Sequence, residues 1–189
     1  MGQVNGSRVM HCVAMDRSSA IAGVVLAGGL STRMGVNKAF LSFKGKPLID
    51  RVASVVASVC NGNIYVSGRI QGYTCIEDEW PHMGPAAAIL SVIQKIGKEY
   101  LGLLFVPVDM PNLTVEILTG LVQEKNAHGA YYQDHPLPLW LNTSLEQPKL
   151  CKSVRELISS LNIEKLHIPK NSEDKFVNTN TPEEWAALI

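Results

Sequence analysis

AGVVLAGGLSTRMGVNK, residues 22–38, is the stretch that decides the fold of this chain. Val24, Val25 and Leu26 form an aliphatic run that is typical of a strand buried on both faces. The glycine pair that follows lets the backbone turn sharply where a side chain would obstruct it. The stretch therefore predicts a buried strand that ends in a glycine-rich loop.

This loop carries the groups that a polyphosphate needs. Backbone amides beside glycine can point at an anion, Arg33 adds a planar fork of donors, and Lys38 adds a point charge. The spacing excludes a P-loop, because Val36 follows Gly35 where a lysine is required, and the glycine intervals exclude the dinucleotide fingerprint. A plain turn with solvated cations is the alternative interpretation. The whole pattern favours a nucleoside triphosphate site of another kind.

The composition is that of a soluble globular protein with one substantial core. Seventeen basic and seventeen acidic residues cancel, which argues against nucleic acid or a membrane surface as a partner. The cysteines lack the spacing of a metal or redox site, so reduced thiols in a cytoplasmic protein are expected at Cys12, Cys60, Cys75 and Cys151. We expect residues 1–20 to be a flexible, dispensable extension and residues 21–189 to form a single domain.

Strand and helix patterns alternate along the rest of the chain. Helices are expected at 48–60, 84–97, 114–126 and 149–161, with a final helix capped by Thr181 and starting at Pro182. Further strands are expected at 63–67, 73–76, 101–108, 130–133, 138–141, 165–168 and 176–177, and a short extended piece and turn at 39–47. This alternation predicts an α/β fold, with a mostly parallel central sheet and helices on both faces.

Asp109 directly follows the most apolar stretch of the chain, residues 101–108. Open α/β sheets bind ligands outside the carboxyl ends of their strands. A carboxylate placed there can hold Mg²⁺, which binds through one or two carboxylates together with phosphate oxygens of the substrate. A turn or helix-cap aspartate is the alternative. Beside a triphosphate loop, the magnesium site is favoured.

The pattern Leu-Ala-Gly-Gly-x-Ser-x-Arg-Met-Gly-x-x-Lys at residues 26–38 resembles the signature loop of the sugar-nucleotide-type nucleotidyltransferases, and most of all that of the molybdenum cofactor guanylyltransferases. The resemblance extends from Gly23 to Leu188. It implies a Rossmann-like nucleotidyltransferase fold and transfer of GMP from GTP to molybdopterin or its molybdenum form, with release of pyrophosphate. Mg²⁺ is the implied cofactor, and other proteins of cofactor biosynthesis are possible partners.

The resemblance also implies a role for individual residues. Those implied to bind the nucleotide are Leu26, Ala27, Gly28, Gly29, Lys38, Ser67, Asp78 and Asp109. The implied catalytic residues are Arg33, Lys38 and Asp109, with Asp109 as the metal ligand, and those implied to contact the acceptor are Asn178 and Asn180. The segment from His135 to Trp140 resembles the part of the family that faces the acceptor, although Trp140 could equally be a core aromatic.

The chain departs from the family pattern at two places. Ser67 stands where the family often has asparagine, so the paired donor and acceptor of the amide are lost. Residues 86–88 are three alanines in place of Leu-Ala-Gly, after the expected acidic segment that ends in Asp78. Neither His82 nor His135 has a partner at ligand spacing, so both are expected at the surface rather than on a metal.

Two alternative functions remain open at this point. A sister enzyme would use CTP, as a molybdopterin cytidylyltransferase does, but Leu-Ala-Gly-Gly favours guanine in these families and Gly29 fits that pattern. A module that binds nucleotide without catalysis is the other alternative. The presence of Arg33, Lys38 and Asp109 argues against it.

Overall fold

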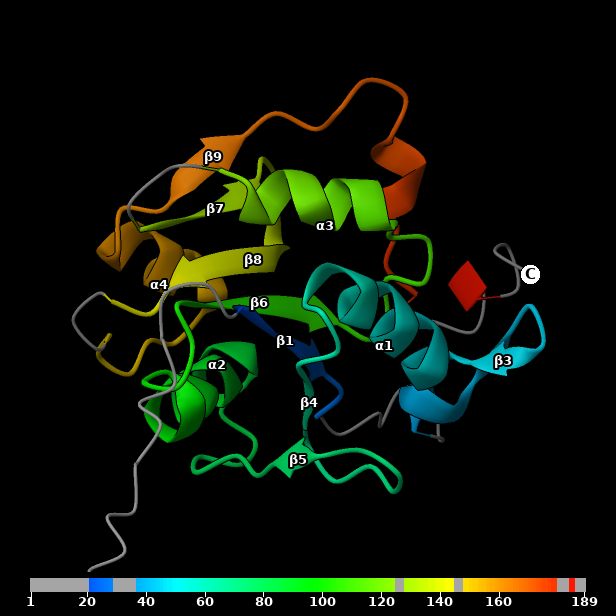
Figure 1. Ribbon diagram of the computed structural model, residues 1–189, viewed down its shortest axis with the longest axis horizontal. Helices are drawn as coiled ribbons and strands as arrows, with labels where there is room; N and C mark the ends of the chain where they lie inside the picture. The colour runs from blue at the N-terminus through cyan, green and yellow to red at the C-terminus, as the bar shows by residue number, and fades with distance from the viewer. Residues whose placement is uncertain (1–20, 29–36, 125–127, 145–147, 180–183, 186–189) are drawn as a thin grey trace, which may run out of the picture.

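A seven-stranded sheet forms the centre of the molecule, in the order β5-β4-β1-β6-β8-β7-β9 (Figure 1). The structure is a computed structural model that describes residues 21–28, 37–124, 128–144, 148–179 and 184–185. The strands of this sheet are β1 Ile21–Leu26, β4 Ile64–Ser67, β5 Cys75–Ile76, β6 Gly102–Pro107, β7 Gly129–Tyr132, β8 His135–Asn142 and β9 Glu164–Leu166.

The sheet is mostly parallel, as the sequence predicts. Strands β5, β4, β1 and β6 run in one direction, and β7 pairs in parallel with β9. Strand β8 runs antiparallel to both of its neighbours, β6 and β7. The start of β8 therefore lies at the same edge of the sheet as the carboxyl ends of β1, β4 and β6.

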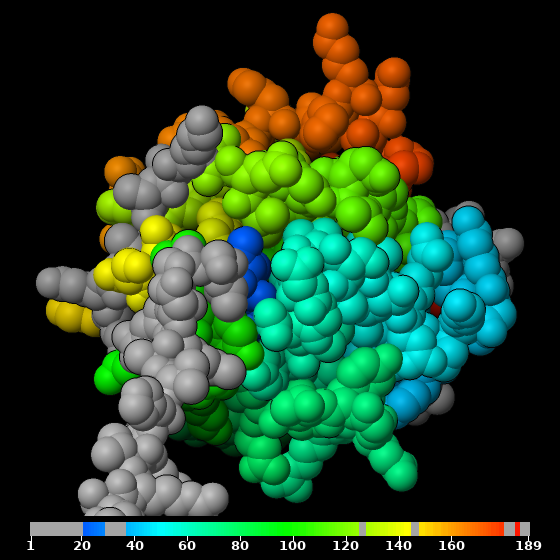
Figure 2. Space-filling view, viewed as in Figure 1, coloured from blue at the N-terminus to red at the C-terminus, as the bar shows by residue number. Residues whose placement is uncertain are grey.

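Helices cover both faces of the sheet. Helices α1 Leu48–Val59 and α3 Val115–Val122 pack side by side over one face, and their side chains close over it in the space-filling view (Figure 2). Helices α2 Pro85–Ile96 and α4 Val154–Ser160 pack on the other face. The two valines of β1 point to opposite faces: Val25 packs in the core under α1, and Val24 packs in the core under α2. None of the helices within the described residues is long and apolar enough to cross a membrane.

Several expected boundaries are wrong. The segment at 176–177 is not a strand, because the 3-10 helix η2 Glu173–Phe176 brings the Phe176 ring 5.1 Å from Tyr132 and 4.9 Å from His135. Helix α4 begins at Val154 rather than at 149, since the Ser153 side chain caps it by accepting a hydrogen bond from the Glu156 amide. Helix α3 ends at Val122, earlier than expected.

The segment after the glycine-rich loop also differs from the expectation. A 3-10 helix, η1 Lys38–Phe40, replaces the start of the predicted extended piece, and the Asn37 side chain caps it by accepting a bond from the Ala39 amide. The extended part is confined to a small hairpin of β2 Ser42–Phe43 and β3 Lys46–Pro47. The expected cap and start of the final helix, Thr181 and Pro182, lie outside the described residues.

Gly102 makes room for Trp140, which is a buried core residue. A Cβ atom built on Gly102 would lie 1.7 Å from the indole of Trp140, and this rigid ring has no flexible end that could move aside. Gly120, in the middle of α3, is the contrasting case, because the first atom that its Cβ would meet is the Tyr132 hydroxyl at 3.1 Å. The first strand residue of β6 is therefore fixed by packing against β8.

We predict that Gly102→Ala lowers the free energy of unfolding by about 2–3 kcal/mol through overpacking of the core. Gly120→Ala is the matched control, because alanine improves helix propensity there by about 1 kcal/mol and offsets the small displacement of Tyr132. Chemical denaturation of both variants measures the difference. Equal stabilities for the two variants would contradict this account of the β6–β8 contact.

Candidate active site

A cleft of about 1050 Å³ opens at the carboxyl edge of the parallel strands. Four neighbouring parallel strands each contribute to its lining, either from their last residue or from the loop that follows. These residues are Gly28 after β1, Ser67 at the end of β4, Asp78 after β5 and Asp109 after β6. The antiparallel β8 contributes its first residue, His135, at the same edge. The fold thus gathers side chains that are far apart in the sequence around one opening.

The cleft collects every predicted site residue that the structure describes. These residues are Leu26, Ala27, Gly28, Lys38, Ser67, Asp78, Asp109 and Asn178. The other predicted site residues, Gly29, Arg33 and Asn180, lie outside the described residues. Residues predicted for the nucleotide, the metal and the acceptor therefore line one continuous space.

Lys38 and Asp109 form an ion pair in the cleft, with 3.5 Å between Nζ and Oδ2. The Lys38 side chain is 17% exposed and that of Asp109 is 21% exposed, so water screens this pair poorly. Burial raises the pKa of Asp109; Lys38 opposes this effect and Glu184 adds to it, and the net shift remains upward. Burial thus disfavours the charged carboxylate, and Lys38 offsets only part of this effect.

This environment fits a divalent cation that arrives with the nucleotide. Mg²⁺ is commonly held by one or two carboxylates while phosphate oxygens and water complete its coordination. Among the residues that the structure describes, no three histidine, cysteine, aspartate or glutamate side chains gather into a metal site. Asp109 can therefore serve as a protein ligand for a cation whose coordination is completed by phosphate oxygens.

The backbone around Asp109 aims its side chain at the cleft. The amide of Val108 donates to the carbonyl of Leu26 at 3.2 Å, which continues the β1–β6 pairing up to the residue before Asp109. Val108 and Met110 are both buried in the core cluster under α1 and α3. Asp109 lies between these two anchors and lines the cleft.

Gly68 is a site residue that the sequence analysis missed. Its φ angle is +125°, which disfavours any side chain, and a Cβ there would lie 3.2 Å from the Gly28 nitrogen. The amide of Ala27 donates to the carbonyl of Ser67 at 3.1 Å, so the ends of β1 and β4 come close together. The Ser67-Gly68 pair at the end of β4 is the sequence signal for this close approach.

Asp78 is held by another residue that the sequence analysis missed, Ser91 in α2. The Ser91 hydroxyl lies 2.9 Å from Oδ1 of Asp78, and the Trp80 amide donates to the same oxygen at 3.0 Å. Ser91 is fully buried and also accepts a bond from the Glu79 amide. A single hydroxyl within a run of buried apolar helix residues was the available signal. Asp78 is thus fixed at the edge of the cleft.

The far end of the cleft is built from the turn before β8, from β8 itself and from α4. His135 lines it, with its ring 4.9 Å from Phe176, and residues 134–137 form this wall of the cleft. Arg155, also missed by the sequence analysis, lines the same end and donates to the carbonyl of Asp134 at 3.1 Å. Trp140, farther along β8, is buried in the core instead.

The sequence pattern of the MobA-like NTP transferase domain matches residues 23–165. The chain belongs to this family. It is 34% identical over 177 residues to the molybdenum cofactor guanylyltransferase of Xanthomonas euvesicatoria, a match that covers 88% of this chain and 93% of the relative. The predicted family and its enzyme class, a nucleotidyltransferase, are confirmed.

Solved structures share the fold of this MobA-like chain. Molybdopterin-guanine dinucleotide biosynthesis protein A from Archaeoglobus fulgidus superposes with a TM-score of 0.66 at 20% identity, over 88% of this chain and 96% of that one. A nucleotidyl transferase from Methanothermobacter gives 0.65 at 14% identity, over 89% and 95%. The predicted α/β nucleotidyltransferase fold is therefore confirmed.

We predict that Asp109→Asn does not destabilise the metal-free protein at pH 7. A carboxyl group whose pKa is raised in the folded state stabilises the fold below its unfolded pKa, about 4, and this contribution is lost as pH rises through the folded pKa. The melting temperature of the variant relative to wild type should therefore increase from pH 4 to pH 7. Thermal unfolding of both proteins across this range measures the difference.

Asp174→Asn is the control for this pH series, because the Asp174 side chain is 64% exposed and water screens its ion pair with Lys175. Its melting temperature relative to wild type should change little over the same range. A relative melting temperature of Asp109→Asn that falls with rising pH would show that the charged carboxylate stabilises the fold.

Proposed function

We propose that this chain transfers GMP from GTP to molybdopterin or its molybdenum form and releases pyrophosphate. The observation that carries the proposal is the Lys38–Asp109 pair, which is largely buried at the centre of the cleft. The lysine can bind a triphosphate, and the poorly hydrated carboxylate can bind the cation that accompanies it. The name of the relative from Xanthomonas, molybdenum cofactor guanylyltransferase, supports the identity of the two substrates.

The proposed reaction is an in-line displacement at the α-phosphorus of GTP. An oxygen of the acceptor phosphate forms the new P–O bond, and the bond to the β-phosphate bridging oxygen breaks, so that pyrophosphate leaves with the electron pair. The enzyme needs no nucleophile of its own. Its task is to align the two phosphates and to neutralise the charge on their oxygens.

The residues of the cleft divide this task. Lys38, together with Arg33 from the glycine-rich loop, would neutralise phosphate oxygens of GTP, and the backbone at Gly28 leaves room for the nucleotide. Asp109 would hold Mg²⁺, which when bound supplies a Lewis acid for the charge on the phosphate. Asn178, with Asn180 beyond it, would contact the acceptor from the C-terminal side.

The nucleotide and acceptor would occupy different ends of the cleft. Ser67 and Asp78, at the β4–β5 end, would contact GTP, and the Ser91 bond keeps the Asp78 carboxylate in one orientation for that contact. Residues 134–137 and Arg155 lie at the β8 end, where the acceptor would enter. The thiols of Cys60, Cys75 and Cys151 are unpaired, which is compatible with the cytoplasmic location proposed for the enzyme.

The purified chain should release pyrophosphate when GTP, molybdopterin and Mg²⁺ are supplied together. Mass spectrometry should detect the guanine dinucleotide of molybdopterin, and CTP or ATP in place of GTP should give little turnover. Faster turnover with CTP would identify a cytidylyltransferase instead. Binding of a nucleotide without release of pyrophosphate from GTP, CTP or ATP would favour a non-catalytic module.

We predict that Asp109→Asn lowers turnover about 100-fold at ordinary Mg²⁺ and that higher Mg²⁺ restores part of it, because the amide remains a weak oxygen ligand.

Lys38→Ala should weaken GTP binding about tenfold through the loss of a charged contact to phosphate. Lys98→Ala is the control, since Lys98 is exposed and lies away from the cleft. Wild-type activity in Asp109→Asn would reject Asp109 as the metal ligand.

A further inference from the structure

The loop of residues 109–111 is attached to two distant parts of the chain. The first attachment is Thr179, whose amide donates to the carbonyl of Asp109 at 3.0 Å and whose hydroxyl donates to the same oxygen at 3.2 Å. A carbonyl oxygen has two lone pairs, so Thr179 can satisfy both. The backbone oxygen of Asp109 is thereby fully used, and the side chain is left as the group that faces the cleft.

Thr179 holds the loop from a position where it cannot touch a substrate. It is fully buried, one of few polar side chains in the described chain that are, while its neighbour Asn178 lines the cleft. A valine has a similar shape but would remove one of the two bonds to the Asp109 carbonyl, so packing alone does not explain threonine here. The hydroxyl therefore serves the bond to Asp109.

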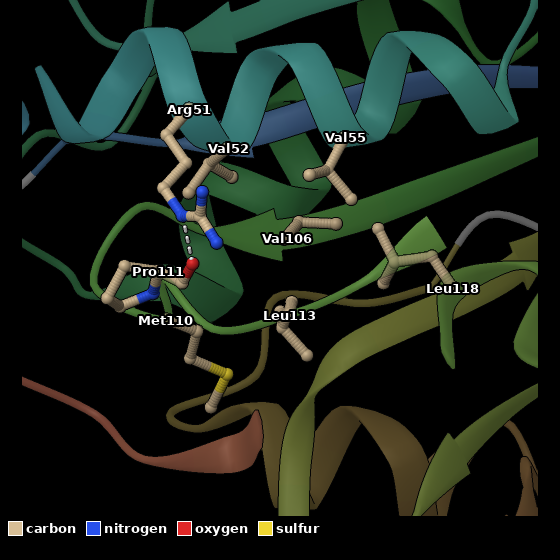
Figure 3. Close-up of a pocket in the computed structure, with 8 residues that line it drawn as sticks. All are labelled: Arg51, Val52, Val55, Val106, Met110, Pro111, Leu113 and Leu118. Carbon is tan, nitrogen blue, oxygen red and sulfur yellow. Dashed lines mark hydrogen bonds between the residues drawn. The ribbon is translucent and has the colours of Figure 1, made fainter. Parts of the chain in front are cut away.

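The second attachment is Arg51 in α1, which donates from Nε to the carbonyl of Pro111 at 2.5 Å. Figure 3 shows the guanidinium reaching down from the helix to this carbonyl, with Val52 above it and Met110 below. The Phe43 ring lies 5.2 Å from the guanidinium carbon and helps to fix the arginine. The loop is thus held at its first residue by Thr179 and at its last by Arg51.

We propose that Thr179 and Arg51 are positioning residues, which fix the Asp109 carboxylate where it binds the metal ion that accompanies the nucleotide. The inference rests on the proposed function for the role of Asp109. A carboxylate on a loop free to shift would pay an ordering cost each time the metal bound, and the two attachments remove that cost in advance. Thr179 also joins Asp109 to the segment that carries Asn178, so the proposed metal ligand and this proposed acceptor residue keep one relative position.

The test compares Thr179→Val, Thr179→Ser and Arg51→Met with wild type, and it uses Mn²⁺ as a probe for the metal. Mn²⁺ binding is measured by electron paramagnetic resonance with GTP present and acceptor absent, and hydrogen exchange is followed in a peptide that spans residues 104–113. Tyr132→Phe is the matched control, because the Tyr132 hydroxyl is also buried and donates to a backbone carbonyl, that of Ile117 at 2.9 Å, but it does not line the cleft.

We expect Thr179→Val and Arg51→Met each to weaken Mn²⁺ binding roughly three- to tenfold, which is the loss of one hydrogen bond converted to affinity. Exchange in the loop should become faster in both variants, and Thr179→Ser should restore both readouts. Tyr132→Phe should lower the melting temperature about as much as Thr179→Val does, while its Mn²⁺ binding stays at the wild-type level. Unchanged Mn²⁺ affinity in Thr179→Val, or an equal loss in Tyr132→Phe, would overturn the proposal.

Arg51→Lys guards against a folding defect in the methionine variant, because it keeps the charge and one donor but loses the fork. It should fall between wild type and Arg51→Met in Mn²⁺ affinity, and an affinity below that of Arg51→Met would count against the proposal. A wild-type chain that binds Mn²⁺ with GTP but releases no pyrophosphate would contradict the proposed function alone. A wild-type chain that binds no Mn²⁺ would overturn the positioning role as well.

Discussion

The charge on Asp109 is the constraint on which the rest of the cleft depends. Taking a carboxylate out of water is costly, and Lys38 at 3.5 Å offsets part of this cost without cancelling it, since the pKa of Asp109 remains raised. The Asp109 carbonyl is occupied by two bonds from Thr179, so the carboxylate is the group of this residue that is left for a cation.

The sheet explains how so specific a point is maintained. Asp109 comes immediately after the last hydrogen bond between β1 and β6, and the residues on either side of it are buried. The close approach of Gly28 and Gly68 keeps the neighbouring strand ends free of side-chain bulk. Rigid strands thus supply the position, and glycine supplies the space in which a nucleotide can approach the backbone.

The sequence predicts the parts of this site that are encoded locally. The strand before Gly28, the apolar run before Asp109 and the alternation of strands and helices are patterns within short windows, and all of them appear in the structure. Thr179 and Arg51 are different, because their bonds to the 109–111 loop span 70 and 60 residues and depend on tertiary packing. The sequence predicts a strand at residues 176–177, because an apolar pair after polar residues gives no sign that Phe176 packs on Tyr132 and His135.

The reversed direction of β8 has a consequence for how this enzyme can diversify. Four neighbouring parallel strands, from β5 to β6, provide one half of the cleft, while the wall at residues 134–137 comes from the turn between β7 and β8 and from the first residues of β8. Turns of this kind tolerate insertion and substitution far better than the strands that they join. In the proposed reaction, donor and acceptor recognition therefore lie on separate parts of the fold, so that changes at the acceptor end leave the donor end intact.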